Sequence, residues 1–261
     1  MFTALSCDST PQQDSAGPEA RMDDRDYVKL KPELMGFRFV GTVPQEARPL
    51  LTRAYEDLKA SMGPRWDEQI AEKEICWMNI WQEDEEGDSM ELSDKVLAKE
   101  LHDWCLKASA EFAEKGAIMD GYGFVVNPIG SKQQAWHVDY TTDAAAIWIP
   151  LTQFTDRNAT QFITLPETTP DDALETVASN VDAVDVDALA RSVDHFEVHQ
   201  IVAKPMSVLY MGRGTIHRGI SNSGDDNRIS FYISLHFIRD YAVYPYYADE
   251  RSEKAVVNFN D

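Results

Sequence analysis

The chain has 261 residues, of which 43% are hydrophobic, enough for a sizeable core. Its 24 basic and 45 acidic residues give a formal net charge of −21, which opposes nucleic acid and anionic membrane surfaces as partners. No uninterrupted apolar run approaches the ~20 residues of a membrane helix.

The N-terminal part of the chain has the pattern of a tail followed by alternating strands and helices. Residues 1–25 are rich in Ser, Pro, Gln, Asp and Gly, which predicts a disordered tail. Apolar spacing then predicts strands at 36–40 and 74–82, and helices at 44–62 and 93–115. An acidic turn is expected at 83–88. The second helix is expected to begin after Ser93 as N-cap and to bury one stripe of side chains: Val96, Leu97, Leu101, Trp104 and Leu106.

Short β-rich runs dominate the second half. They occur at 123–126, 145–149, 160–163, 197–203, 207–210 and 229–237, with Gly, Asn and Asp between them. This predicts a mainly β protein with accessory helices and a sandwich or jelly-roll core. An acidic, Ala-rich insertion at 167–194, helical at 185–191, fits either a lid or a solvated loop. We expect one domain over 26–261, with a supporting region at 26–118 and the jelly-roll core at 119–240.

The cysteines and the start of the chain bear on the compartment. Cys7, Cys76 and Cys105 are widely spaced and form no CxxC, so free thiols in a reducing environment are expected. The first ten residues lack the basic and long apolar regions of a secretory signal. A cytoplasmic protein is therefore predicted.

Three residues in the β-rich half have the types and order of a metal site. His137 and Asp139 form His-x-Asp, and the alternation of an extended chain directs both side chains to one side. His217 follows the predicted strand at 207–210 and a Gly-Arg-Gly turn. Two imidazoles and one carboxylate form the facial triad that binds non-haem Fe(II) and leaves positions open for other ligands. Because Asp139 fills a position that glycine or alanine would leave to halide, oxygen insertion is favoured over halogenation.

The other four histidines have simpler interpretations. His102 lies in a predicted helix and His236 in the last predicted strand. His195 and His199 border the acidic insertion, where they could line a cavity; the expectation is that both are exposed.

Arg228 and Ser230 add a second element to the pattern, because they form Arg-x-Ser shortly after His217. A guanidinium can bind a carboxylate through two parallel hydrogen bonds. A metal with open positions beside a carboxylate anchor indicates an oxygenase that uses a 2-oxo acid.

At this point the sequence resembles the Fe(II)/2-oxoglutarate-dependent dioxygenases of the phytanoyl-CoA dioxygenase-like superfamily. The resemblance covers roughly residues 120–240 and rests on four segments: Gln134 to Asp139 (Q-x-W-H-x-D), Trp148 to Phe162, Met211 to Asn222 around His217, and Arg228 to Ser230. It implies a double-stranded β-helix, the cupin-like jelly roll. An acyl-CoA substrate would need a basic groove for its phosphates, and the sequence has no basic cluster.

The resemblance also implies a set of site residues and cofactors. Fe(II) would be held by His137, Asp139 and His217, with O2 and the cosubstrate 2-oxoglutarate at the open positions. Arg228 and Ser230 would bind the far carboxylate of 2-oxoglutarate. Four further residues are expected to contact the cosubstrate: Asn127, Gln134, Thr160 and Trp148.

The resemblance implies oxidation of a small organic metabolite, with release of succinate and CO2. Hydroxylation is the simplest outcome, and desaturation or ring closure are variants of it. Arg213 is a candidate anchor for a substrate carboxylate. A basic peptide remains an alternative substrate for so acidic a protein.

Two other classes of protein share parts of this pattern. A cupin-type isomerase or epimerase would use the same metal ligands without a 2-oxo acid, and Arg228-x-Ser230 argues against it. A non-catalytic metal-binding relative would keep the barrel, and the intact triad argues against that.

Overall fold

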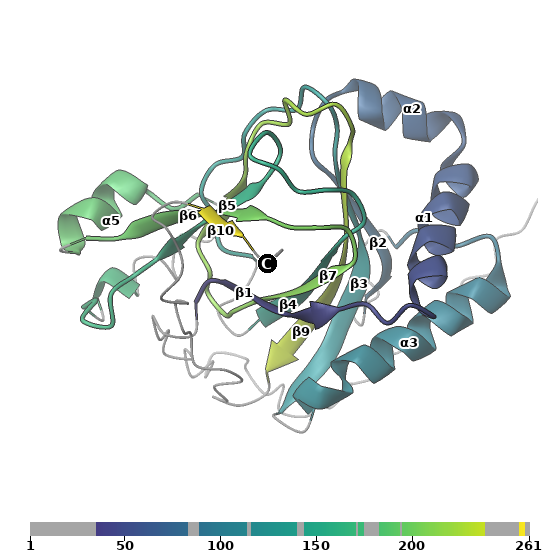
Figure 1. Ribbon diagram of the computed structural model, residues 1–261, viewed down its shortest axis with the longest axis horizontal. Coiled ribbons are helices and arrows are strands. Elements are labelled where there is room, and N and C mark those ends of the chain that lie inside the picture. The colour runs from purple at the N-terminus through teal and green to yellow at the C-terminus, as the bar shows by residue number, and fades with distance from the viewer. Residues whose placement is uncertain are drawn as a thin grey trace, which may run out of the picture.

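The computed structural model describes residues 35–82, 89–113, 116–139, 144–170, 172–174, 183–193, 195–237 and 256–258. Two sheets face each other, and three helices lie along one side of the pair (Figure 1). The predicted tail at 1–25 and the predicted acidic turn at 83–88 fall outside the described residues.

The larger sheet has six strands in the order β1-β7-β4-β9-β3-β2. They are β1 (Phe37–Thr42), β7 (Ser207–Met211), β4 (Ala144–Pro150), β9 (Arg228–Phe237), β3 (Ala117–Asn127) and β2 (Cys76–Gln82). The smaller sheet has the order β10-β6-β5-β8. Its strands are β10 (Val256–Asn258), β6 (Glu197–Val202), β5 (Thr160–Thr164) and β8 (His217–Gly219). Strands distant in sequence are neighbours in both sheets, as in a jelly roll, so the predicted double-stranded β-helix is confirmed.

Alternation along the strands of the larger sheet separates two cores. On β9, Phe231, Ile233 and Leu235 belong to the core that the helices cover. Tyr232, between them, belongs to the core between the two sheets. Because Arg228 and Ser230 are four and two residues before Tyr232, they project into the same interior.

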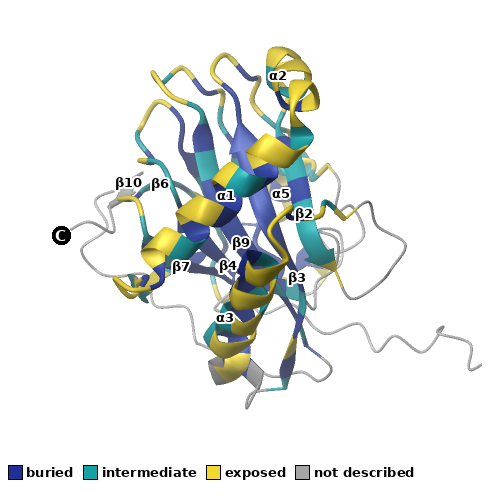
Figure 2. Cartoon of the chain, turned by 90° about the vertical axis from the view of Figure 1, so that its right-hand side faces the viewer, coloured by how far each residue is buried: buried dark blue, intermediate teal, exposed yellow. Residues whose placement is uncertain are grey.

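The helices α1 (Arg48–Met62), α2 (Pro64–Ala71) and α3 (Lys95–Ala113) lie beside the larger sheet with their exposed sides outward (Figure 2). The sequence did not indicate α2, which begins at Pro64 after Gly63 takes a φ of +55°. Proline is favoured at the first helical position, and glycine tolerates a positive φ.

The expected buried stripe of α3 was partly wrong. Leu97, Leu101 and Cys105 are buried, four residues apart, and this places them on one face of the helix. Val96 is 68% exposed and Leu106 is 47% exposed, because both project away from that face. Apolar residue type alone did not distinguish the two faces.

The N-cap of α3 also differs from the prediction. Asp94 Oδ1 accepts hydrogen bonds from the amides of Val96 (2.9 Å) and Leu97 (3.0 Å), whereas Ser93 donates its own amide to Asp57. We expect Asp94→Ala to lower the free energy of unfolding by about 0.5–2 kcal/mol, since two amides lose their acceptor. The control Ser93→Ala should change it by less than about 0.5 kcal/mol. Urea denaturation measures both, and equal losses would contradict this assignment of the cap.

The acidic insertion contributes α5 (Val186–Ser192), which lies on the far side of the barrel from α1, α2 and α3 (Figure 1). Its N-cap is Asp185, whose side chain accepts from the amide of Ala188 at 2.9 Å. In the part of the chain that the structure describes, no helix is both long and apolar enough to cross a membrane.

Candidate metal and cosubstrate site

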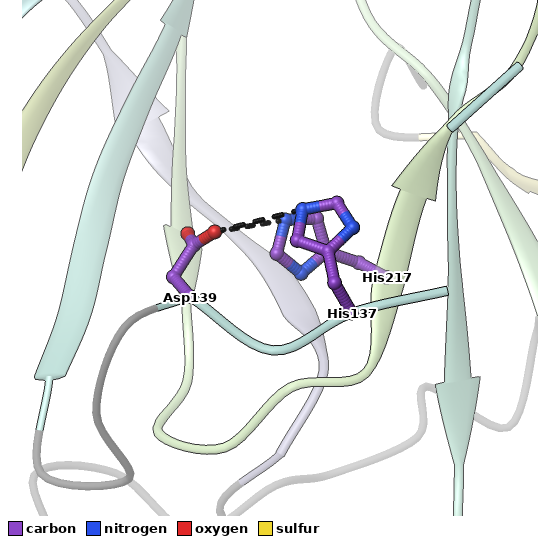
Figure 3. A group of neighbouring side chains, drawn as sticks. All are labelled: His137, Asp139 and His217. Carbon is purple, nitrogen blue, oxygen red and sulfur yellow. Dashed lines mark ion pairs between the residues drawn. The ribbon is translucent and has the colours of Figure 1, made fainter. Parts of the chain in front are cut away.

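His137, Asp139 and His217 point toward one another in the barrel (Figure 3). His137 and Asp139 lie on the segment between β3 and β4, and His217 is the first residue of β8. The backbones of His137 and His217 exchange two hydrogen bonds, of 3.0 and 2.9 Å. This single antiparallel bridge holds together two ligands that are distant in sequence.

The three side chains offer one ligand atom each within a small volume. Asp139 Oδ1 lies 3.7 Å from His137 Nε2 and 3.5 Å from His217 Nε2, and all three ligand atoms lie within 4.8 Å of one another. The His217 side chain is buried, whereas those of His137 and Asp139 are 16% and 21% exposed. One ion would therefore be protected on the His217 side and open to ligands on the other.

Hydrogen bonds set the tautomer of both imidazoles. Nδ1 of His137 lies 3.0 Å from the carbonyl oxygen of Ala135, and Nδ1 of His217 lies 2.9 Å from that of Thr215. Because a carbonyl only accepts, each Nδ1 carries the proton and each Nε2 keeps its lone pair for a metal. Burial lowers the pKa of His217, which favours the neutral form that a metal needs, while Asp139 acts in the opposite direction. The donor set thus fits Fe(II).

Arg228 is buried at the start of β9, with 3% of its surface exposed. Its Nη1 donates to the carbonyl oxygens of Asn158 (3.0 Å) and Ala159 (2.8 Å) and to Oγ1 of Thr160 (3.2 Å). None of the carboxylates in the described ranges forms an ion pair with it. Burial lowers the pKa of Arg228 to about 10, so the guanidinium remains charged at neutral pH.

The buried polar atoms without a hydrogen-bond partner among the described residues include Nε of Arg228, Oγ of Ser230 and Nε1 of Trp148. All three side chains project from the faces of β4 and β9 that line the interior, because Ser230 lies opposite Pro150 and Tyr232 lies opposite Trp148. A buried polar group without a partner costs about 1–3 kcal/mol. A carboxylate bound beside Arg228 and Ser230 would accept from their free donors and neutralise the guanidinium.

The space around Gly219 shows that the guanidinium of Arg228 lies close to the strand that carries the metal ligand His217. A Cβ atom on Gly219 would lie 2.9 Å from Nη2 of Arg228 and 2.9 Å from Oε1 of Gln134. The guanidinium therefore lies against the face of β8 that also carries His217, two residues earlier. Two residues of strand span about 7 Å. This is comparable to the length of a five-carbon dicarboxylate, so one molecule would reach both the metal and Arg228.

We expect Gly219→Ala to weaken 2-oxoglutarate binding by roughly tenfold or more. The added methyl group must displace a buried guanidinium that three acceptors hold, and such overpacking costs about 1–3 kcal/mol. Fe(II) affinity should be retained, because Gly219 is not a ligand. Titration of the Fe(II)-loaded protein with 2-oxoglutarate measures the change. An unaltered cosubstrate affinity would show that Arg228 is free to move.

The other predicted cosubstrate residues lie around the same end of the barrel. Oε1 of Gln134 accepts from the amide of Gly219 at 2.7 Å. Asn127 is fully buried, with Nδ2 donating to the carbonyl of Ile220 (3.4 Å) and Oδ1 accepting from the hydroxyl of Ser131. Both amides thus support the segment around β8. That they also bind the carboxylate next to the 2-oxo group stays a prediction.

One expectation about a residue outside the triad is corrected by the structure. His199, expected to be exposed, is 2% exposed; its ring stacks on Phe162 at 5.0 Å, and Nε2 lies 2.8 Å from Oγ1 of Thr164. The alternation of β6 turns it inward, although it borders the insertion. Arg213, the candidate substrate anchor, has its guanidinium 5.4 Å above the Phe237 ring. That Arg213 binds a substrate carboxylate stays a prediction.

The acceptors that fix Arg228 are not visible in the sequence. The carbonyl groups of Asn158 and Ala159 belong to a turn, and backbone acceptors have no signature in residue type. Gly219 did carry a signal, because a glycine within a strand often marks a close approach of another group.

No family model matches the sequence, and no curated protein matches it significantly. Solved structures do match. AviO1 from Streptomyces viridochromogenes Tue57 is 14% identical, with a TM-score of 0.53 over 81% of this chain and 94% of that one. EctD from S. alaskensis, solved with 2-oxoglutarate and 5-hydroxyectoine, is 14% identical, with a TM-score of 0.53 over 87% and 80%. SnoK, a non-haem α-ketoglutarate-dependent carbocyclase from nogalamycin biosynthesis, is 12% identical, with a TM-score of 0.52 over 82% and 83%. The chain therefore has the double-stranded β-helix fold found in non-haem, 2-oxoglutarate-dependent enzymes.

Proposed function

We propose that the protein is an Fe(II)- and 2-oxoglutarate-dependent oxygenase of the phytanoyl-CoA dioxygenase-like superfamily. The observation that carries this proposal is the buried guanidinium of Arg228, which has an unpartnered Nε and lies against the strand of His217. A metal triad alone fits many cupin-type proteins. The buried, charged guanidinium lies at a distance from the triad that is comparable to the length of a short dicarboxylate. This supports a 2-oxo acid as cosubstrate.

Each part of the site then has a separate task. His137, Asp139 and His217 would hold Fe(II), and a metal held by three protein ligands would keep positions for the cosubstrate and O2. Iron, 2-oxoglutarate and O2 together supply the oxidation of a substrate C–H bond, with release of succinate and CO2. Arg228 would bind the far carboxylate of 2-oxoglutarate, and the hydroxyl of Ser230 would donate to the same group.

The remaining interior keeps water away from the reacting groups. Phe37 packs against both Phe162 (5.5 Å between ring centroids) and His217 (6.1 Å). Trp148 lies 6.0 Å from Trp77, with its ring edge-on. These rings exclude solvent on the protected side of the metal and stabilise the orientation of the His217 imidazole.

The substrate is proposed to be a small organic metabolite, and hydroxylation is the expected outcome. Asp139 leaves no position for halide, which argues against halogenation. The fold likeness to EctD, solved with 5-hydroxyectoine, and to the carbocyclase SnoK supports a small molecule and admits ring formation as a variant. The net charge of −21 does not favour an acyl-CoA with its phosphate groups.

Anaerobic addition of Fe(II) and 2-oxoglutarate tests the cosubstrate. A weak visible metal-to-ligand charge-transfer band is expected, since it requires the 2-oxo and carboxylate oxygens to chelate the iron. Succinate, which lacks the 2-oxo group, should give no band. Metal-loaded protein without the band would reject the proposal and favour an isomerase or epimerase that uses the metal alone.

A further inference from the structure

The segment that carries His137 and Asp139 is not part of a regular strand. Its pairing with β8 consists of the His137–His217 bridge and the bond from the Gln134 amide to the Gly219 carbonyl (2.9 Å). Two of the three metal ligands therefore lie on backbone that the sheets hold at few points. Other contacts must fix its position before a metal is bound.

Alternation divides the side chains of this segment between two sides. His137 and Asp139 point to the metal position, so Trp136 and Val138 point to the opposite side. Val138 is 3% exposed there, within a hydrophobic cluster that also contains Ile216, the residue before His217. The rest of this cluster comes largely from the acidic insertion and its flanks, and includes Leu165, Ala173, Leu174, Leu189 and Val193. The insertion thus packs directly behind the metal ligands.

Two polar contacts hold Trp136 from the same side. The amide of Val184, just before α5, donates to the carbonyl oxygen of Trp136 at 2.7 Å. The guanidinium of Arg218 lies 4.1 Å above the Trp136 ring, a cation–π distance. Nε and Nη2 of Arg218 both donate to Oε1 of Gln161, at 2.9 and 2.8 Å, so the cation is fixed to β5.

We infer that residues 183–193 and Arg218 form a brace that positions His137 and Asp139 for the metal. The inference rests on the proposed function only in that it requires a metal at the triad. Because docking of the brace and binding of the metal both fix the same segment, each stabilises the other. The described part of the insertion therefore supports the segment of His137 and Asp139 on the side opposite to the metal, rather than covering the substrate.

Leu189→Ala tests the brace, with Leu101→Ala as the matched control. Both leucines are buried in helices, at 4% and 0% exposure, but Leu101 belongs to the core beside the larger sheet. Titration with Co(II), followed by its visible spectrum without any 2-oxoglutarate, measures metal affinity. We expect Leu189→Ala to weaken Co(II) binding by about tenfold, within the range of coupled sites. Leu101→Ala should alter it by less than about twofold at a temperature where both variants are folded.

Arg218→Met is a second, milder variant, because Arg218 is only partly buried and methionine keeps an apolar contact with Trp136. It should also weaken Co(II) binding, and Arg218→Lys should restore part of the loss by returning the cation. Equal Co(II) affinity in the wild type, Leu189→Ala and Arg218→Met would overturn the brace. A wild type that binds no Co(II) would instead overturn the proposed function, so the two failures are distinguishable.

The reciprocal effect gives an independent readout. Adding Mn(II) to the wild type should slow hydrogen exchange at the amides of Leu189 in α5 and of Val193 at its C-cap, which donate to Asp185 and Leu189. The α1 amide of Leu51, which donates to Ala47, should exchange at an unchanged rate. Identical slowing at both helices, or none at α5, would contradict a coupling specific to the brace.

Discussion

Replacing His137 with alanine is expected to abolish Fe(II) binding while the protein stays folded. Loss of a residue that only supports a metal ligand already costs 10–100-fold in affinity, so loss of the ligand itself should cost more than roughly 100-fold. The His137 side chain is 16% exposed and its backbone makes the bridge to His217, so the fold loses little. Calorimetric titration with Fe(II) under anaerobic conditions measures the affinity, and thermal unfolding without metal checks the fold.

His102→Ala is the matched control for this experiment. His102 lies on α3, where its ring packs edge-on against Trp81 at 5.2 Å, outside the barrel. Its removal deletes one imidazole from the chain without touching the triad, so Fe(II) affinity should remain that of the wild type. Metal binding that survived His137→Ala and disappeared in His102→Ala would show that the ion binds elsewhere.

The long strands of the fold could be predicted from the sequence because alternation is a local property. Every predicted run of the second half lies within or overlaps a strand, and β3 and β9 extend further because they pair with each other over most of their length. The two shortest strands, β8 and β10, have three residues each, too few for an alternating pattern. Partners distant in sequence determine them, and such pairing is not visible in a local window.

Some features of the candidate site can likewise be recognised from residue type, whereas others depend on the tertiary structure. His-x-Asp, His217 and Arg-x-Ser are chemically distinctive, and the structure brings the three metal ligands together. The sequence could not reveal that Nη1 of Arg228 is held by two backbone carbonyls, because any residue supplies those. It also left the insertion as either a lid or a solvated loop. Composition gives the apolar residues of an insertion but not the surface on which they pack.

Replacing Arg228 with alanine is expected to weaken 2-oxoglutarate binding strongly and to leave Fe(II) binding nearly unchanged. Removing one partner of a buried, hydrogen-bonded charge pair costs about 2–5 kcal/mol, which corresponds to a roughly 30-fold or greater loss of affinity. Arg228→Lys should recover only part of it, because an ammonium group cannot bind a carboxylate through a planar pair of donors. The charge-transfer band at increasing 2-oxoglutarate measures cosubstrate affinity, and Co(II) titration measures metal affinity separately.

Arg157→Ala is the control for the loss of a positive charge near this end of the barrel. Arg157 pairs with Asp225 at 3.2 Å, with side-chain exposures of 52% and 87%, and such surface pairs contribute little. Both affinities should therefore match the wild type in this variant. If Arg228→Ala lost the metal together with 2-oxoglutarate, the guanidinium would be supporting the triad through β8 rather than binding the cosubstrate. If it lost neither, the buried cation would be structural, and the carboxylate anchor would have to be sought among other residues.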